Sequence, residues 1–279
     1  MSFPTSGISL AGQVAIITGG GRGLGRGMAE CLAAAGAKVA VIARSEDQLK
    51  QTVAAIETRG GHALAFVASV TDRQAVDHIV REVERQLGPV DILVNNAGIG
   101  HPLGPMWEVD PDQWWENLNV NLRGPFLCAR AVLPGMVQRR RGRVINIVSG
   151  AGNVALAHVS AYVTAKTALI RLSENLAAET KEYNVQAFAV DPGTVRTVLA
   201  EWVLESEEGQ KWMPWFASIF AEGRDVPAEQ SAQLVLFLSS GRADELSGQF
   251  IGVGDDVAAW VQRAEEIRQN ELHVLRRRD

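Results

Sequence analysis

The stretch VAIITGGGRGLG at positions 14–25 joins a short β-branched run to a glycine-rich turn and then to a helical pattern. Residues 14–18 predict a strand, and residues 23–35 predict a helix. Glycines allow a tight turn and a close approach of the backbone, and a helix that starts there points free N–H groups at a phosphate. A purely structural turn can also use glycines. The position directly after the first strand favours a dinucleotide-binding site.

The rest of the chain alternates short apolar runs with longer amphipathic stretches. Further strands are predicted at 38–43, 63–67, 91–94, 143–148, 186–190 and 249–253. Helices are predicted at 45–59, 71–87, from 110, 160–182 and 227–238, with capping side chains at Ser45, Thr71 and Asp110. Pro125 and Pro134 predict a bend or break in the helix that starts at Asp110.

Several of these strands are apolar almost throughout, which is typical of a parallel sheet covered on both faces. We therefore predict an α/β fold, a single-domain Rossmann-type doubly wound sheet of about seven parallel strands with helices on both faces. We expect this single domain, for dinucleotide binding and catalysis, to span residues 1–279. Two segments depart from the alternation: an aromatic-rich segment at about 194–225, read as a substrate lid, and a polar helical tail from about 257.

Composition excludes several classes of protein. The net charge is −5, which disfavours non-specific binding of nucleic acid. No apolar run is long enough to span a membrane, and the N-terminus has no signal-peptide pattern. Two cysteines indicate reduced thiols in a cytoplasmic protein. The five histidines are scattered and no C-x-x-C pair occurs, so we predict no metal site.

Several motifs recur in a fixed order after the first strand. The glycine turn has the spacing T-G-x-x-x-G-x-G, and N-N-A-G follows at 95–98. NVNLRGPF occupies 119–126, YVTAK occupies 162–166 with Ser149 thirteen residues before its tyrosine, and Pro192-Gly193 follows the sixth strand. In these motifs the chain resembles the short-chain dehydrogenase/reductase family from residue 9 to about 254, and this resemblance implies an oxidoreductase.

The pair Tyr162 and Lys166 carries the predicted acid–base chemistry. The two residues are spaced i, i+4, so one helix face presents both side chains. A cation about 4 Å from the tyrosine would contribute on the order of 4 kcal/mol, and would lower its pKa by about three units from about 10. Tyr162 is therefore the predicted general acid/base. The resemblance implies that Lys166 also binds the nicotinamide ribose, that Ser149 polarises the carbonyl, and that Asn121 completes a water-linked proton path.

The resemblance also implies a set of residues that contact the cofactor. They are Gly19, Gly21, Arg22, Gly23, Leu24, Gly25, Arg44, Ser45, Ser69, Val70, Asn95, Ala97, Gly98, Tyr162, Lys166, Pro192, Gly193, Val195 and Thr197. The Asn95 side chain is expected to tie its strand to neighbouring segments, with only its backbone near the cofactor. Ser69 stands where many family members have aspartate, and Gly254-Asp255-Asp256 stands where many have an acid followed by two glycines.

Two basic residues predict which nicotinamide cofactor is bound. An enzyme for the unphosphorylated cofactor commonly has an acid at the end of the second strand, where this chain has Ala43 followed by Arg44. Arg22 lies inside the glycine turn. Two guanidiniums suit a 2′-phosphate, so NADP is the predicted cofactor. Both arginines are also compatible with a surface role.

The sequence thus predicts an NADP-dependent oxidoreductase for a small alcohol or carbonyl substrate, forming a homodimer or homotetramer. Five aromatic residues in 198–224 and Trp107, Trp114 and Trp115 predict a bulky apolar substrate, although the rings could instead fasten the lid or fill an interface. Gly209 and Gly223 are candidate hinges for the lid. A non-catalytic nucleotide sensor or scaffold on the same fold is the main alternative, and an epimerase or dehydratase is a third.

Overall fold

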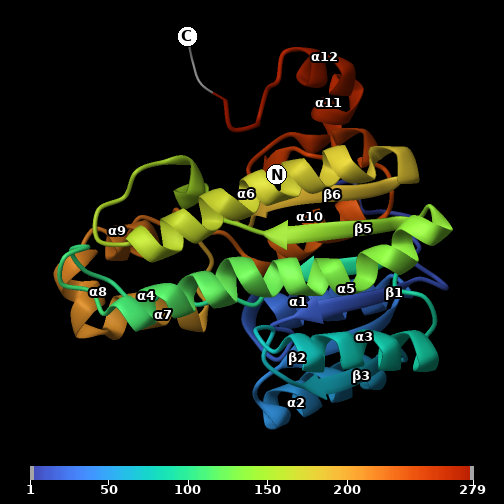
Figure 1. The fold of residues 1–279 in the computed structure, drawn as a ribbon, viewed down its shortest axis with the longest axis horizontal. Helices are drawn as coiled ribbons and strands as arrows, with labels where there is room; N and C mark the ends of the chain where they lie inside the picture. Colours follow the sequence, from blue (N-terminus) through green and yellow to red (C-terminus); the bar gives the residue numbers. More distant parts are fainter. Residues whose placement is uncertain (1–2, 277–279) are drawn as a thin grey trace.

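The computed structural model describes residues 3–276 and builds them around one sheet of seven parallel strands (Figure 1). The strand order is β3-β2-β1-β4-β5-β6-β7. The strands are β1 Val14–Thr18, β2 Lys38–Ala43, β3 His62–Val67, β4 Ile92–Asn95, β5 Gly142–Ile147, β6 Val185–Asp191 and β7 Phe250–Gly252. The order reverses between β1 and β4, which opens a crevice at the carboxyl ends of these strands. The predicted Rossmann-type fold is confirmed.

Helices cover both faces of the sheet because the strands present apolar side chains on both sides. One face packs against α1 Gly23–Ala34, α2 Glu46–Thr58 and α10 Ala228–Ser239. The other face packs against α3 Arg73–Gln86, α5 Gly124–Arg139 and α6 Ser160–Thr180. Alternate residues of a strand enter the two layers: Ile17 of β1 belongs to the first and Ile16 to the second.

The long helix predicted from Asp110 is interrupted. It forms α4 Pro111–Leu118, a π-helical turn η1 Asn119–Arg123, and then α5. Asp110 caps α4 as predicted, because its carboxylate accepts the N–H of Gln113 at 2.8 Å. The interruption ends just before Pro125, whereas Pro134 lies inside α5 without ending it. A π turn accommodates an extra residue at a functional position, and here it surrounds the buried Asn121.

Two of the predicted helix caps are wrong. Ser45 precedes α2, but its side chain accepts no capping hydrogen bond. The cap of α3 is Asp72, whose carboxylate accepts the N–H groups of Gln74 and Ala75. Thr71, the predicted cap, instead shares a 2.8 Å hydrogen bond with the hydroxyl of Ser69.

The two irregular segments both form helices. The aromatic-rich segment contains α7 Val198–Glu205, α8 Glu207–Trp212 and α9 Phe216–Ala221, which we call the lid helices. The tail forms α11 Val257–Gln262 and α12 Ala264–Gln269, and its Val257, Ala264 and Ile267 are buried in the core. The tail is therefore helical as predicted, but one side of it is apolar. The remaining 3₁₀ turns are η2 Gly150–Asn153, η3 Lys181–Tyr183 and η4 Asp244–Leu246. Within residues 3–276, no helix has the length and hydropathy needed to cross a lipid bilayer.

Candidate functional site

The glycine turn between β1 and α1 is built for close approach. Gly19 has φ +65°, and a Cβ there would lie 2.8 Å from the Asn96 side-chain nitrogen. A Cβ on Gly25 would lie 2.3 Å from the carbonyl oxygen of Gly19. The first turn of α1 contains no acid, and the N-cap Arg22 makes no capping hydrogen bond. The helix therefore directs uncapped N–H groups and a partial positive charge at the crevice, which suits a phosphate.

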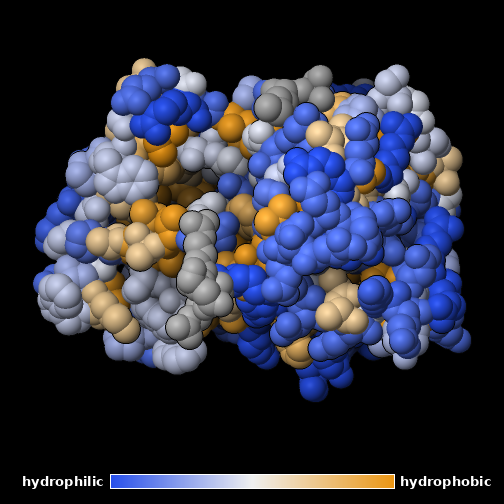
Figure 2. All heavy atoms as spheres, turned by 90° about the horizontal axis from the view of Figure 1, so that it is seen from above, coloured by the Kyte–Doolittle hydropathy of each residue, from blue (hydrophilic) through white to orange (hydrophobic). Residues whose placement is uncertain are grey.

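A cavity of about 790 Å³ runs from this turn along the carboxyl ends of the strands. All but one of the predicted site residues line it. These are Gly19, Gly21, Arg22, Gly23, Leu24, Gly25, Arg44, Ser45, Ser69, Val70, Ala97, Gly98, Asn121, Ser149, Tyr162, Lys166, Pro192, Gly193, Val195 and Thr197. Figure 2 shows hydrophobic side chains around a hollow at the end of the molecule where the lid helices lie.

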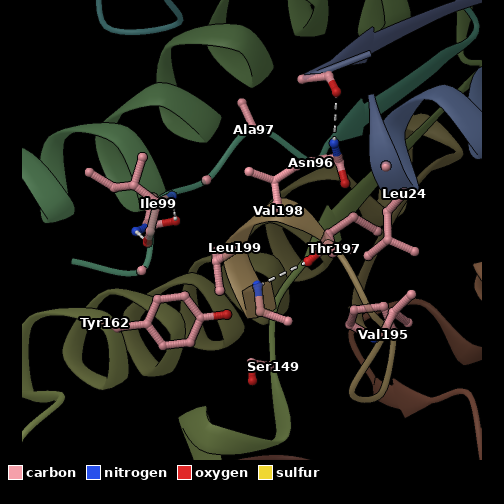
Figure 3. A pocket seen from close by; sticks show the side chains of 18 of the residues that line it. Leu24, Asn96, Ala97, Ile99, Ser149, Tyr162, Val195, Thr197, Val198 and Leu199 are labelled. Atoms are coloured by element: carbon pink, nitrogen blue, oxygen red, sulfur yellow. Dashed lines mark hydrogen bonds between the residues drawn. The ribbon is translucent and has the colours of Figure 1, made fainter. Parts of the chain in front are cut away.

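Asn95 is the predicted site residue that does not line the cavity, and the next residue, Asn96, lies in the cavity wall instead. Asn95 is buried and donates to the Asn146 side chain at 2.8 Å and to the Pro125 carbonyl at 3.3 Å, so it ties β4 to β5 and α5. Asn96 lines the cavity (Figure 3). It donates to the Thr18 carbonyl at 2.9 Å. Side chains of consecutive strand residues point to opposite sides. The expectation that the Asn95 side chain ties its strand to neighbouring segments is confirmed, whereas Asn96 was not selected as a cavity residue.

Ser149, Tyr162 and Lys166 come together from two elements. Ser149 follows β5, and Tyr162 and Lys166 lie one turn apart in α6. The Tyr162 hydroxyl points into the cavity (Figure 3). The Lys166 ammonium is buried, donates to the Ile147 carbonyl at 2.9 Å, and lies 5.5 Å from the centre of the Tyr162 ring. The arrangement places two hydroxyls where a substrate oxygen can reach both.

The pKa of Tyr162 moves opposite to the sequence-based expectation. Desolvation raises the pKa of Tyr162 to about 12, a hydrogen bond with Ser149 opposes this rise, and the charge of Asp191 adds to it. Burial lowers the pKa of Lys166 to about 8. The expected lowering of the Tyr162 pKa by Lys166 is not found in this geometry: the Lys166 ammonium is directed at the Ile147 carbonyl, and desolvation is the largest cause of the shift. The tyrosine therefore keeps its proton at neutral pH.

Asn121 lies in the π turn and is fully buried. Its amide donates to the Ile99 carbonyl at 2.8 Å and its oxygen accepts the Ile99 N–H at 3.3 Å. A Cβ on Gly98 would lie 2.7 Å from the Asn121 oxygen and 3.8 Å from the Lys166 ammonium. The π turn thus fixes Asn121 beside the lysine, where the proposed proton path would pass.

The two arginines predicted to select the cofactor are both exposed and line the same end of the cavity. Within residues 3–276, neither Arg22 nor Arg44 forms an ion pair with a carboxylate. Gln48 of α2 also lines this end, and it was not predicted. Two cations without an acidic partner in the described chain form a positive pocket at the end of β2.

The opposite end of the cavity is apolar. Its wall comes from the segments after β4 and β5 and from the lid helices, and includes Leu103, Leu156, Val159, Leu199, Val203, Met213, Trp215, Phe216 and Ile219. Sequence reasoning missed the aliphatic residues because each looks like ordinary core in isolation. An apolar wall with few polar groups is typical of a small-molecule site.

The predicted convergence of both tryptophan clusters on one cleft is wrong. Trp107 and Trp115 are 84% and 65% exposed, and Trp114 donates to the Ser160 hydroxyl at 3.0 Å. Of the lid aromatics, Trp215 and Phe216 line the cavity. Trp212 instead packs against the ring of His158, with centroids 4.6 Å apart. The other rings therefore fasten segments together or face outward.

The two candidate hinge glycines differ in their surroundings. A Cβ on Gly209 would lie 1.8 Å from the Val203 carbonyl oxygen, so close packing between α7 and α8 requires glycine there. Gly223 has φ +64° and open space around it. Gly223 stays a predicted hinge, whereas the need for glycine at 209 is explained by packing.

Within residues 3–276, no group of three or more His, Cys, Asp or Glu side chains is placed to hold a metal ion. The acidic residue Asp191, at the end of β6, lines the cavity wall, and the sequence analysis did not select it. Its place directly before Pro192-Gly193 was the signal that could have found it.

Comparisons with known proteins agree with this geometry. A family model described as short chain dehydrogenase matches residues 13–208. A short chain dehydrogenase of Pseudocercospora fijiensis is 36% identical, covering 92% of this chain and 85% of the relative. Gluconate 5-dehydrogenase of Gluconobacter oxydans is 32% identical, covering 91% and 97%. A solved structure from Beutenbergia cavernae with NADP at low occupancy is 32% identical with a TM-score of 0.78, covering 90% of this chain and 98% of that one.

Proposed function

Because this chain belongs to the short-chain dehydrogenase/reductase family, we propose that it is an oxidoreductase that transfers hydride between NADP and a bulky, apolar alcohol or carbonyl compound. The observation that carries the proposal is a single cavity that joins the uncapped N-terminus of α1 to the hydroxyls of Ser149 and Tyr162. Among relatives, gluconate 5-dehydrogenase bears a name for the same kind of reaction.

The residues at the glycine turn fit a dinucleotide. The Cβ positions of Gly19 and Gly25 are blocked by neighbouring atoms, so the turn has no side chains at these positions and its backbone can approach a ligand closely. The free N–H groups of α1 would hold the pyrophosphate, and Arg22 and Arg44 would hold a 2′-phosphate. When bound, the nicotinamide supplies or takes up the hydride. The NADP seen in the Beutenbergia cavernae structure is consistent with this pocket.

The protein's own residues would move the proton. In the direction of reduction, the Ser149 hydroxyl donates a hydrogen bond to the carbonyl oxygen and Tyr162 gives its proton to the same oxygen. A pKa of about 12 keeps that proton available at neutral pH and leaves it acidic enough for an alkoxide to take. Lys166, held by the Ile147 carbonyl, and Asn121 would return the proton from water.

Turnover separates this function from a non-catalytic nucleotide sensor. We expect the purified protein to oxidise NADPH when ketones of varied size are supplied, followed by the loss of absorbance of the reduced cofactor. Tight NADP(H) binding without turnover of any ketone or alcohol would instead support the sensor. We also propose a cytoplasmic location, which the two unpaired cysteines support.

Aryl ketones should be reduced better than small aliphatic ketones. Trp215 and Phe216 line the apolar end of the cavity, and burial of an aromatic contact is worth on the order of 1.5 kcal/mol. Trp215→Ala and Phe216→Ala should therefore each lower the ratio of kcat/KM for aryl over aliphatic ketones by about tenfold. Trp107→Ala, which changes an exposed ring, is the control. An unchanged ratio in both lid variants would show that these rings only pack.

The protein should form a homodimer or homotetramer. Trp115 of α4 is 65% exposed and Phe126 of α5 is 48% exposed, on the outer side of the helices that follow β4. Large apolar side chains in water favour a partner surface. Light scattering at micromolar concentration should give a mass of at least twice 30.1 kDa. A monomer at that concentration would contradict the expectation.

A further inference from the structure

Asp191 is the one acidic side chain in the cavity wall among residues 3–276. The Val148 N–H donates to the Val190 carbonyl at 2.8 Å, which holds the ends of β5 and β6 together. One Asp191 carboxylate oxygen accepts the Gly193 N–H at 3.1 Å, and the other lies 2.9 Å from where a Cβ on Gly150 would be. The carboxylate is therefore fixed beside the turn that begins at Ser149.

No basic side chain of the described cavity lies at its apolar end, beyond this carboxylate. The basic residues in the wall are Arg22, Arg44 and Lys166. The arginines lie at the glycine-turn end, and the Lys166 ammonium is buried against the Ile147 carbonyl. An anionic substrate would lose its hydration there, find no cation to pair with, and meet the charge of Asp191.

We propose that Asp191 determines substrate charge: it excludes anions, so that the site takes uncharged or cationic carbonyl compounds with an apolar body. This inference rests on the proposed function and narrows it. It also separates this chain from the gluconate 5-dehydrogenase relative, whose named substrate is a carboxylate. The residue acts through its fixed charge beside the reacting hydroxyls.

The carboxylate must be ionised for this selection. Burial raises the pKa of Asp191, the N–H groups of Gly193 and Gly150 act against that rise, and the charge of Asp255 adds to it. The comparison is therefore made at pH 8, well above the ordinary range of a carboxyl group.

The test uses four acetophenones that differ only in the para substituent: carboxylate, carboxamide, methyl ester and trimethylammonium. With NADPH at pH 8, we expect kcat/KM for the carboxylate to be at least about tenfold below that of the amide, since like charges about 10 Å apart, across the ring from the reacting carbonyl, still repel at the effective dielectric of a protein site. The cation should be reduced better than the anion. Hydration, aromatic contacts and ring electronics also differ between these two ions, so the change of this ratio when Asp191 loses its charge isolates the field of Asp191.

Asp191→Asn should lower the amide-to-carboxylate ratio by about tenfold, because the amide oxygen still accepts the Gly193 N–H while the charge is lost. Glu205→Gln, an exposed acid on lid helix α7, is the matched control and should leave the ratio unchanged. NADPH binding, followed by tryptophan quenching, reports whether the variant is folded. If it does not fold, Asp191→Ser, whose hydroxyl can accept the Gly193 N–H without a charge, is the second variant, and the same loss of the ratio is expected.

The proposal is overturned if the unmodified protein reduces the carboxylate as well as the amide, or the anion as well as the cation. It is also overturned if a folded Asp191→Asn variant keeps the original ratio. If the protein reduces neither these ketones nor aliphatic ketones, the proposed function is itself wrong, and the inference about Asp191 is wrong with it. An active enzyme without charge discrimination leaves the proposed function standing.

Discussion

Replacing Tyr162 with phenylalanine is expected to lower kcat by about 10²–10⁴-fold, the usual contribution of a positioned general acid/base. Only the hydroxyl is removed, so the ring still packs in α6. A pKa raised to about 12 means that this hydroxyl carries its proton throughout the neutral range. The measurement is single-turnover reduction of an aryl ketone with NADPH, together with NADPH affinity, which should stay within a few-fold of the unmodified protein.

The chain provides a matched control for this substitution. Tyr183 is the other tyrosine, it is 42% exposed in η3, and it lies outside the cavity. Tyr183→Phe should leave kcat unchanged. If Tyr162→Phe keeps turnover within a few-fold of the unmodified protein, the proton comes from another group and the assignment of Tyr162 is wrong.

NADP(H) should be preferred over NAD(H) by on the order of 10²-fold or more in kcat/KM, because hydrogen bonds to a charged group contribute roughly 1.5–3 kcal/mol each. The phosphate would bind between the guanidiniums of Arg22 and Arg44, which form no ion pair within the described chain. Arg44→Asp should move the preference toward NAD(H), since the new carboxylate repels a 2′-phosphate and can accept from ribose hydroxyls.

The control for this change has the same charge difference at a distant site. Arg81→Asp alters an exposed residue of α3 and should leave the cofactor ratio unchanged. The cofactor ratio is kcat/KM for NADP(H) divided by kcat/KM for NAD(H), with both values measured with the same ketone over the same concentration series. Equal values for both cofactors in the unmodified protein, or a preference for NAD(H), would refute the role of the two arginines.

Strands, helices and motifs were predictable because their signals are local. The apolar runs at 14–18, 38–43 and 143–148 reveal buried parallel strands, and the structure places all three within a residue of these bounds. The glycine spacing after β1 reflects how close the backbone must come to its neighbours, as the blocked Cβ positions of Gly19 and Gly25 show. The i, i+4 spacing of Tyr162 and Lys166 follows from helix geometry alone.

Competition between neighbouring groups limited the local predictions. Thr71 and Asp72 are both good caps in sequence, and Asp72 caps α3 because the Thr71 hydroxyl is engaged with Ser69. The break in the helix after Asp110 was expected at a proline, yet it falls on the π turn around Asn121. There, the buried amide takes both of its backbone partners from Ile99, twenty-two residues away.

The sequence by itself determined the fold class and the order of the motifs along the chain, because period, turn chemistry and helical spacing are properties of short segments. It also selected Ser149 and Tyr162 as the candidate hydroxyl pair, Ser149 through the family resemblance. Only the tertiary structure decided that Asn96 lines the cavity, that Trp215 lines it while Trp115 faces outward, and that Asp191 lies beside Gly150. These facts depend on which strands become neighbours and which side chains lose their water. The raised pKa of Tyr162 has the same origin, since desolvation is a property of the packed surroundings and not of the residue.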